Sequence, residues 1–229
     1  MSMTLSPRLR CIADYVRPGD RVIDVGTDHA YIPIWLLQEG ICDRVTATDL
    51  RSGPLQNAAK DAEKYGVAES LTLLLGDGLA CCAPDSADTI IIAGMGGETI
   101  MGILEAAPWV FSRRLILQPQ TKQPELRAWL RKRGLAIRDA SLAYDAGRIY
   151  LIWLVEAGEM ELCGAVDPQL LTKRDPLLRP YAEDHIKRLR KQIQGMERSS
   201  RADPEQLAQL RKELDAYLDV HREVLKWQP

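Results

Sequence analysis

The segment RVIDVGTDHAYIPI, residues 21–34, places three polar side chains around one glycine. An apolar run ends at Gly26, and Asp24, Asp28 and His29 flank it closely. Two carboxylates at a turn repel a phosphate and attract a cation, whereas a histidine can orient a ligand or serve the structure alone. The segment therefore indicates a site for a positively charged ligand, with a plain tight turn as the alternative.

Three later segments repeat this pattern of an apolar run followed by an acid, a glycine or both. They contain Asp49 in TATDL, Asp77 and Gly78 in LLLGDG, and Gly94 and Glu98 in AGMGGE. An acid about 20 residues after a glycine turn can bind the ribose hydroxyls of a nucleoside cofactor. Asp77 can reach an adenine amino group, and Gly78 leaves room for the ring. Helix capping by Asp49 and Asp77 is the alternative.

The kind of nucleoside follows from the turn at Gly26. Dinucleotide sites use G-x-G-x-x-G to bring a helix against a pyrophosphate, and Asp28 stands where the second glycine belongs. S-adenosylmethionine carries an ammonium and a sulfonium group, which Asp24 and Asp28 could face. The acids therefore favour S-adenosylmethionine over a phosphorylated cofactor.

The elements that position these residues alternate along the first two thirds of the chain. We expect strands at residues 21–25, 44–50, 71–77, 89–96, 114–120 and 149–155, and helices at 30–39, 54–65, 98–106 and 123–133. This alternation predicts an α/β fold, a Rossmann-like parallel sheet with helices on both faces. All the candidate residues then meet at the carboxyl edge of the sheet. A short amphipathic helix, capped by Ser6, should precede the first strand.

The composition changes after Gly164 and predicts a separate helical extension. Two long polar helices with apolar residues three and four apart indicate an antiparallel, coiled-coil-like hairpin. We therefore expect one domain over residues 1–160 and the hairpin over 165–229. The first helix carries a run of basic residues, namely Lys187, Arg188, Arg190, Lys191, Arg198 and Arg201, against Glu197. The run could contact phosphates, or it could be an ordinary solvated surface.

Composition excludes several classes of protein. A chain of 229 residues can bury one full core, and no run reaches the roughly 18 apolar residues that a membrane span needs. We expect no membrane association and a cytoplasmic location, since no signal peptide is recognisable. Five cysteines without C-x-x-C spacing predict reduced thiols and no metal site. The net charge of −2 argues neither for nor against nucleic acid.

Seven blocks together give the sequence a specific resemblance. LSPRLRCIADYV, VIDVGTDHAYIPI, ATDL, GDGL, IAGMGGETI, LQPQ and DAGRIY occur in this order. The chain from Leu5 to Val155 resembles the bacterial tRNA (adenine-22) N1-methyltransferase family. The resemblance implies a class I methyltransferase domain, S-adenosylmethionine as donor and tRNA as substrate, whereas the hairpin resembles the family only in being helical. The oligomeric state stays open, with a monomer favoured.

The resemblance also implies roles for single residues. Asp24, Gly26 and His29 correspond to the first donor-binding motif, Asp49 to the ribose acid, and Asp77 and Gly78 to the adenine side. Gly94 is expected to contact the cofactor, and the loop from Gly94 to Gly97, with Met95 and Gly96, would border the incoming base. AGMGG stands where enzymes acting on exocyclic amines commonly carry an Asp/Asn-Pro-Pro-aromatic loop, which is consistent with a ring nitrogen as the target.

Adenine N1 has an in-plane lone pair, so the reaction requires alignment but no general base. A carboxylate near the N6 amino group would stabilise the cationic product, and Asp28 and Glu98 are the catalytic candidates. The other substrate-binding candidates are Arg8, Tyr31, Gln118 and Gln120 in the sheet domain, and Lys187, Arg188, Arg190 and Lys191 in the hairpin.

Several alternatives stay open. Glu98 could be an acid that the helix dipole favours in the first turn of a helix, without a catalytic role. Tyr31 could be a core residue. A small-molecule methyltransferase, or an inactive cofactor-binding module that binds proteins through its hairpin, would carry the same donor motifs.

Overall fold

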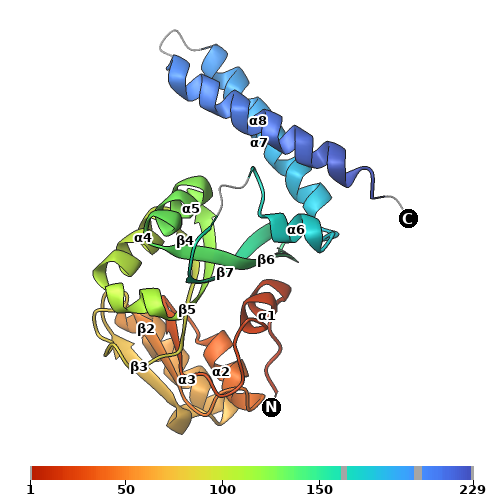
Figure 1. Cartoon of the computed structure of the whole chain (residues 1–229). Coiled ribbons are helices and arrows are strands. Elements are labelled where there is room, and N and C mark those ends of the chain that lie inside the picture. The colour runs from red at the N-terminus through yellow and green to blue at the C-terminus, as the bar shows by residue number, and fades with distance from the viewer. Residues whose placement is uncertain (1, 161–163, 199–202, 228–229) are drawn as a thin grey trace. The chain divides into compact units, whose positions relative to one another are not determined.

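The computed structural model describes residues 2–160, 164–198 and 203–227 of the chain. The chain divides into two compact units, residues 1–160 and residues 161–229. The first unit holds the sheet and its covering helices, and the second holds three helices (Figure 1). Of the residues singled out in the sequence, Cys163 and Arg201 lie outside the described residues.

The first unit is built on one seven-stranded sheet in the order β3-β2-β1-β4-β5-β7-β6. Its strands are β1 (Val22–Val25), β2 (Val45–Asp49), β3 (Leu71–Leu75), β4 (Thr89–Gly96), β5 (Arg114–Thr121), β6 (Leu135–Asp145) and β7 (Arg148–Ala157). The first five are parallel, and the order reverses beside β1, where β2 lies on one side and β4 on the other. This confirms the Rossmann-like class I methyltransferase fold.

The prediction of a wholly parallel sheet was wrong at one edge. Strand β6 was not foreseen, and β7 runs antiparallel to both β5 and β6. Ala146 and Gly147 join β6 to β7 with φ values of 46° and 80°. A two-residue connection with both residues at positive φ matches the right-handed twist of paired strands, so it forms a tight hairpin.

Helices cover both faces of the sheet, as predicted. They are α1 (Pro7–Ala13), α2 (Tyr31–Gln38), α3 (Ser52–Tyr65), α4 (Gly97–Ala106) and α5 (Gln123–Lys132), with short 3₁₀ turns at η1 (Ala68–Ser70) and η2 (Pro108–Ser112). Side chains of α1, α2 and α3 pack with Ile91, Ile116 and Ile152 into one core cluster. Because side chains alternate along a strand, the buried Ile90 and Ile92 face the opposite side, where α4 lies against β4 and β5.

Helix α1 begins where the sequence predicted, but Ser6, the residue before it, has a different role from the one expected. Pro7 occupies the first turn, and Ile12 and Ala13 are buried in the core. Ser6 is the N-cap residue, yet its side chain makes no capping hydrogen bond. Its hydroxyl instead donates to Oδ2 of Asp145, at 2.6 Å. The predicted cap is therefore wrong, because a tertiary acceptor on the β6–β7 hairpin takes the hydroxyl.

The second unit contains α6 (Pro168–Thr172), α7 (Leu178–Glu197) and α8 (Pro204–Val224). Arg211 pairs with Glu197 at 2.8 Å, and His221 lies 3.2 Å from Glu183, so residues far along α8 meet residues early in α7. This pairing identifies the predicted antiparallel hairpin.

An aromatic stack lies inside this hairpin. Burial lowers the pKa of His185, which leaves its ring neutral at pH 7. The ring stacks on Tyr217, with their centroids 4.6 Å apart.

Candidate functional site

The carboxyl ends of β1, β2 and β3 are joined by hydrogen bonds that bring the loops after them together. The amide of Gly26 donates to the carbonyl of Thr48 at 2.8 Å, and the amide of Gly76 donates to the carbonyl of Asp49 at 3.0 Å. The buried Thr48 hydroxyl donates to the carbonyl of Gly78, also at 3.0 Å. Residues predicted from separate segments thus meet at one edge of the sheet, beside the point where the strand order reverses.

Asp24 is a buried acid on β1, with 8% of its surface exposed. Burial raises the pKa of Asp24 from 3.8 to about 6, although a hydrogen bond with the Thr27 side chain acts in the opposite direction. A carboxylate that is destabilised by burial gains most from a nearby cation. The environment of Asp24 therefore suits a positively charged ligand.

Gly26 has a φ of 76°, a conformation that few side chains adopt. A Cβ atom at this position would lie 2.1 Å from Cε of Met95. Met95 belongs to the irregular end of β4, where the pairing with β5 shifts register. The end of the Met95 side chain therefore reaches the turn after β1, and the positive φ of Gly26 is what favours glycine there.

Asp49 ends β2, and its side chain is 12% exposed. Its Oδ1 atom accepts a hydrogen bond from the amide of Arg51 at 2.8 Å, which fixes the loop before α3. Helix α3 has no side-chain cap, so capping in the strict sense does not explain this acid. No described residue donates a hydrogen bond to Oδ2, which leaves that oxygen for a ligand hydroxyl.

His29 lies in a small cluster on the loop after β1. Its Nδ1 atom is 2.7 Å from Oδ2 of Asp61 on α3, and its Nε2 atom is 3.8 Å from Oδ2 of Asp28. The ring stacks on Tyr31, with centroids 5.0 Å apart and planes 16° apart. Tyr31 is 41% exposed and is therefore not the core residue of the alternative interpretation.

Sequence reasoning missed Asp61. The signal was an acid between the buried Ala58 and Ala62, on the half-buried face of α3. Such an acid needs a partner, and His29 supplies it.

Asp28 and Glu98, the two acids predicted to act in catalysis, have 74% and 76% of their side chains accessible. Glu98 lies in the first turn of α4, and its Oε1 atom is 4.0 Å from Nζ of Lys122. Asp77 is also exposed. These three acids are open to an incoming ligand, and their roles stay predictions.

The glycines after β3 and β4 are packed against protein atoms. A Cβ atom at Gly78 would lie 3.1 Å from the side chain of Ile103, and one at Gly96 would lie 3.0 Å from Oγ1 of Thr121. Both positions therefore have a packing explanation, beside the predicted roles near the ligand.

Polar side chains from α1 and β5 lie close to Gly94. Nη1 of Arg8 donates to Oε1 of Gln118 at 3.1 Å. The position of a Cβ atom at Gly94 is 3.7 Å from Nε2 of Gln120 and 4.0 Å from Nη1 of Arg8. The structure thus brings three residues that the sequence assigned to the acceptor side close to Gly94.

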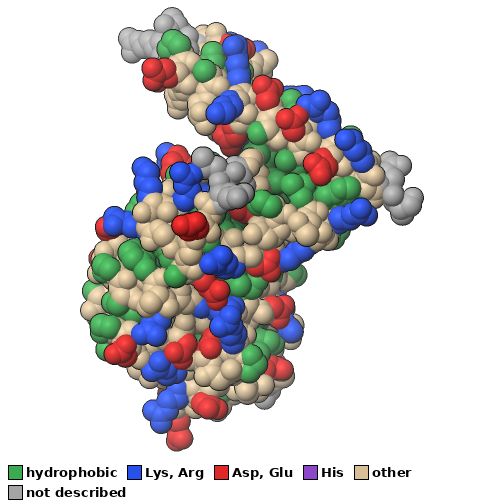
Figure 2. Space-filling model, viewed as in Figure 1, with side chains coloured by type: hydrophobic (Ala, Val, Ile, Leu, Met, Phe, Trp, Pro, Cys, Tyr) green, Lys and Arg blue, Asp and Glu red, His purple; other side chains and the backbone are tan. Residues whose placement is uncertain are grey.

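The predicted tRNA-contacting residues on α7 and at its C-cap divide into two groups. Lys187, Arg190, Lys191 and Arg198 recur three, four or seven residues apart and are exposed, so they form one stripe. Arg188 differs in being paired on its own helix: its Nη2 atom is 2.6 Å from Oδ2 of Asp184. Figure 2 shows basic and acidic side chains interspersed on the visible face of the hairpin.

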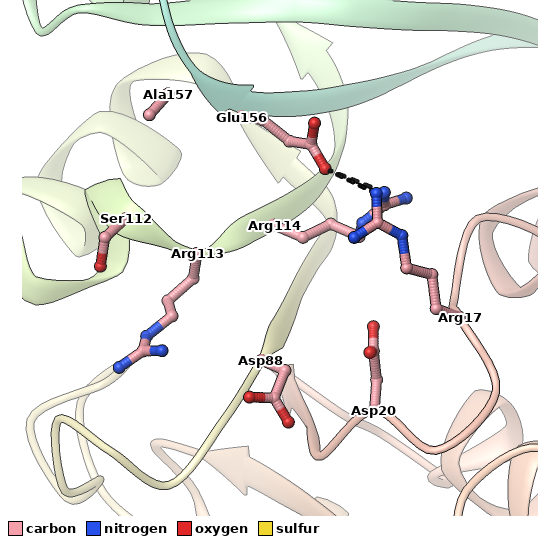
Figure 3. A pocket seen from close by; sticks show the side chains of 8 residues that line it. All are labelled: Arg17, Asp20, Asp88, Ser112, Arg113, Arg114, Glu156 and Ala157. Atoms are coloured by element: carbon pink, nitrogen blue, oxygen red, sulfur yellow. Dashed lines mark hydrogen bonds and ion pairs between the residues drawn. The ribbon is translucent and has the colours of Figure 1, made fainter.

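A charged hollow of about 310 Å³ lies at the opposite, amino edge of the parallel strands (Figure 3). Arg17 and Arg114 both bind Glu156, at 3.3 and 2.8 Å. Hydrogen bonds from Arg21 lower the pKa of Asp88 to about 2. The basic and acidic side chains that line this hollow are equal in number, so we interpret it as a structural ion-pair network and not as a ligand site.

Cys11, Cys42, Cys81 and Cys82 form no disulfide among the described residues. Within residues 2–160, 164–198 and 203–227, no group of three His, Cys, Asp or Glu side chains could hold a metal ion. None of the helices in these ranges is both long and apolar enough to cross a membrane.

Residues 5–153 match the model of a family described as a methyltransferase domain. A Bacillus subtilis protein named tRNA (adenine(22)-N(1))-methyltransferase is 31% identical over 237 aligned residues, which cover 97% of this chain and 98% of that protein. A Streptococcus pneumoniae protein crystallised in complex with S-adenosyl-L-methionine is 32% identical. It superposes with a TM-score of 0.80 over 95% of this chain and 100% of that one.

Proposed function

The chain belongs to the methyltransferase-domain family and, within it, to the tRNA (adenine-22) N1-methyltransferases, and from this premise we infer that it methylates N1 of adenine 22 in tRNA with S-adenosylmethionine as the donor. The observation that carries this function is the identity to the Bacillus subtilis enzyme along almost the whole of both chains. Nothing described above favours a small-molecule methyltransferase or an inactive binding module.

The donor fits the residues at the carboxyl edge of the sheet. Asp24 is a buried carboxylate that a cation would stabilise, and Asp49 has an oxygen free for ribose hydroxyls. The positive φ of Gly26 and the hydrogen bond from its amide to Thr48 fix the turn beside these acids. We propose that Asp24 holds the ammonium group, that Asp49 holds the ribose, and that Asp77 and Gly78 lie on the adenine side.

S-adenosylmethionine, when bound, supplies a methyl group on a sulfonium centre. The protein has to present N1 of the target adenine, whose lone pair needs no prior deprotonation. The methylated base carries a positive charge, which a carboxylate can offset by accepting a hydrogen bond from the N6 amino group. Asp28 and Glu98 are exposed acids that could take this role, and His29 is held by Asp61 so as to keep the loop around Asp28 in place.

Adenine 22 has to leave any stacked or paired arrangement before its N1 atom can react, which requires a firm hold on the surrounding tRNA. We propose that residues 165–229 are a tRNA-binding extension of a catalytic domain formed by residues 1–160. The stripe of Lys187, Arg190, Lys191 and Arg198 supports this role, since exposed cations at helical spacing can follow a phosphate backbone. Because its substrate is tRNA, we place the enzyme in the cytoplasm.

Incubating the purified protein with an unmodified tRNA transcript and labelled donor tests the function directly. Nuclease digestion and mass spectrometry should find 1-methyladenosine at position 22 only. A transcript with guanosine at position 22 is the matched control and should take up no label. Label at another nucleoside, or label on the control transcript, would overturn the assigned target.

A further inference from the structure

Arg8 is held at the acceptor side of the sheet by three different elements. Its Nη1 atom donates to Oε1 of Gln118 on β5, and its Nε atom is 3.9 Å from Oδ2 of Asp145 at the end of β6. Its guanidinium also lies over the ring of Tyr150 on β7, 5.3 Å from the centroid. These contacts fix the direction of a side chain that is otherwise long and flexible.

The residues that hold Arg8 are themselves fixed. Gln118 is 1% exposed, and its Nε2 atom is buried without a hydrogen-bond partner among the described residues. Such an orphaned donor is unfavourable, and an apolar side chain of similar size would avoid it. Asp145 in turn accepts the hydrogen bond from Ser6. Because the chain has glutamine at position 118 despite its unpaired Nε2, we infer that the Oε1 atom of this residue serves to orient Arg8.

Arg8 keeps donors for a ligand. A guanidinium has five N–H groups, and only one of those in Arg8 makes a hydrogen bond to a described residue. The 3.9 Å separation from Asp145 is too long for a hydrogen bond. With 24% of its side chain exposed, Arg8 can still be reached from outside.

The chemistry of the reaction decides what this guanidinium binds. It lies next to Gly94, on the loop that borders the incoming base in the proposed function. A base that gains positive charge during methylation would be repelled by a cation in contact with it. A phosphate, in contrast, offers paired oxygens that match the guanidinium fork.

We propose that Arg8 binds a phosphate flanking the target adenosine in tRNA, and that Gln118, Asp145 and Tyr150 are positioning residues for it. This inference rests on the proposed function. It goes further by assigning an RNA backbone contact to the sheet domain. This contact would position the target nucleotide beside the donor site, a role that the hairpin does not serve.

Neutralising single phosphates tests the contact. The phosphates 5′ and 3′ of adenosine 22 are replaced, each in turn, by an uncharged methylphosphonate, and kcat/KM is measured for the wild type and for Arg8→Gln. At one of the two positions the wild type should lose about 10- to 100-fold, as expected for one charge-assisted contact. Arg8→Gln should show that loss with unmodified tRNA and no further loss with the modified one.

Two more variants separate positioning from folding. Gln118→Leu should also become insensitive to the methylphosphonate, while its thermal unfolding temperature is no lower than that of the wild type and its donor affinity is unchanged. Arg10→Gln is the matched control on the same helix, because Arg10 is paired with Asp14 at 2.7 Å and lies over Trp35. It should keep the wild-type sensitivity.

Salt dependence of tRNA binding, measured without donor, provides a readout that does not need methylation. Arg8→Gln should lower the slope of log Kd against log salt by about one. If the salt slopes of the wild type and Arg8→Gln differ by about one, but the wild type methylates another nucleoside, the target assignment fails and the Arg8 contact stands. If Arg8→Gln stays as sensitive to both methylphosphonates as the wild type, the phosphate contact is overturned.

Discussion

Nδ1 of His29 lies 2.7 Å from Oδ2 of Asp61, which ties the loop after β1 to helix α3. Because a carboxylate only accepts, Nδ1 carries a proton and donates it to Asp61. We expect Asp61→Ala to free the ring and lower the single-turnover rate about tenfold, as for one lost charge-assisted hydrogen bond. Rapid-quench kinetics with saturating donor and tRNA measures this rate. An unchanged rate in a folded Asp61→Ala protein would limit the pair to a structural role.

Donor binding should depend on pH through Asp24. Burial raises the pKa of Asp24 to about 6, so the ligand-free protein gains stability as the pH falls through 6 toward the unfolded value of 3.8. A cationic donor needs the ionised form, and its amino group loses a proton near pH 8, at about the usual α-amino value. Calorimetry should therefore find the highest affinity between these two pKa values. Asp24→Asn should bind weakly and without the acidic decline, and a decline that persists in this variant would exclude Asp24 as its cause.

Asp49→Ala should weaken donor binding by about 2 to 4 kcal/mol, because a charge-assisted pair to the ribose is lost. Isothermal titration measures the change. Since Asp49 also fixes the amide of Arg51, Asp49→Asn is the appropriate control: it keeps an acceptor for that amide and removes only the charge. Wild-type donor affinity in Asp49→Ala would remove this acid from the site.

Asp28→Asn should keep the fold, because Asp28 is largely exposed and the amide has nearly the same shape. If Asp28 accepts from the N6 amino group, the methyl-transfer step should slow by about 10² or more. Single-turnover measurement separates this step from binding. A wild-type rate combined with poor donor affinity would instead assign Asp28 to the ammonium group of the donor and favour Glu98 as the partner of the base.

Replacing Lys187, Arg190 and Lys191 by glutamine should weaken tRNA binding and lower its salt slope by about three, one for each lost phosphate contact. Donor affinity should not change. Arg188→Gln is the control on the same helix, since Arg188 is occupied by Asp184. An equal effect of the control and the triple variant would indicate that only the total charge matters.

The meeting of the loops after β1, β2 and β3 at one edge of the sheet followed from the sequence, because parallel strands that each end in a glycine or an acid place those residues at the same edge. Strand β6 did not follow, since the register shift between Ile137 and Asp139 interrupts the alternation that would have identified it. Ser6 was misassigned and Asp61 was missed for a different reason. Each has a partner distant in the chain, Asp145 and His29 respectively, and a local sequence pattern does not reveal such a partner.

The order of the last strands has a consequence for synthesis on the ribosome. Strand β7 lies between β5 and β6, although it is made after both. Until residues 148–157 emerge, β5 is an open edge with the apolar segment Leu115–Leu117 unpaired on one side. An open apolar edge invites pairing with another chain, so a nascent protein released before β7 is complete would be prone to aggregate.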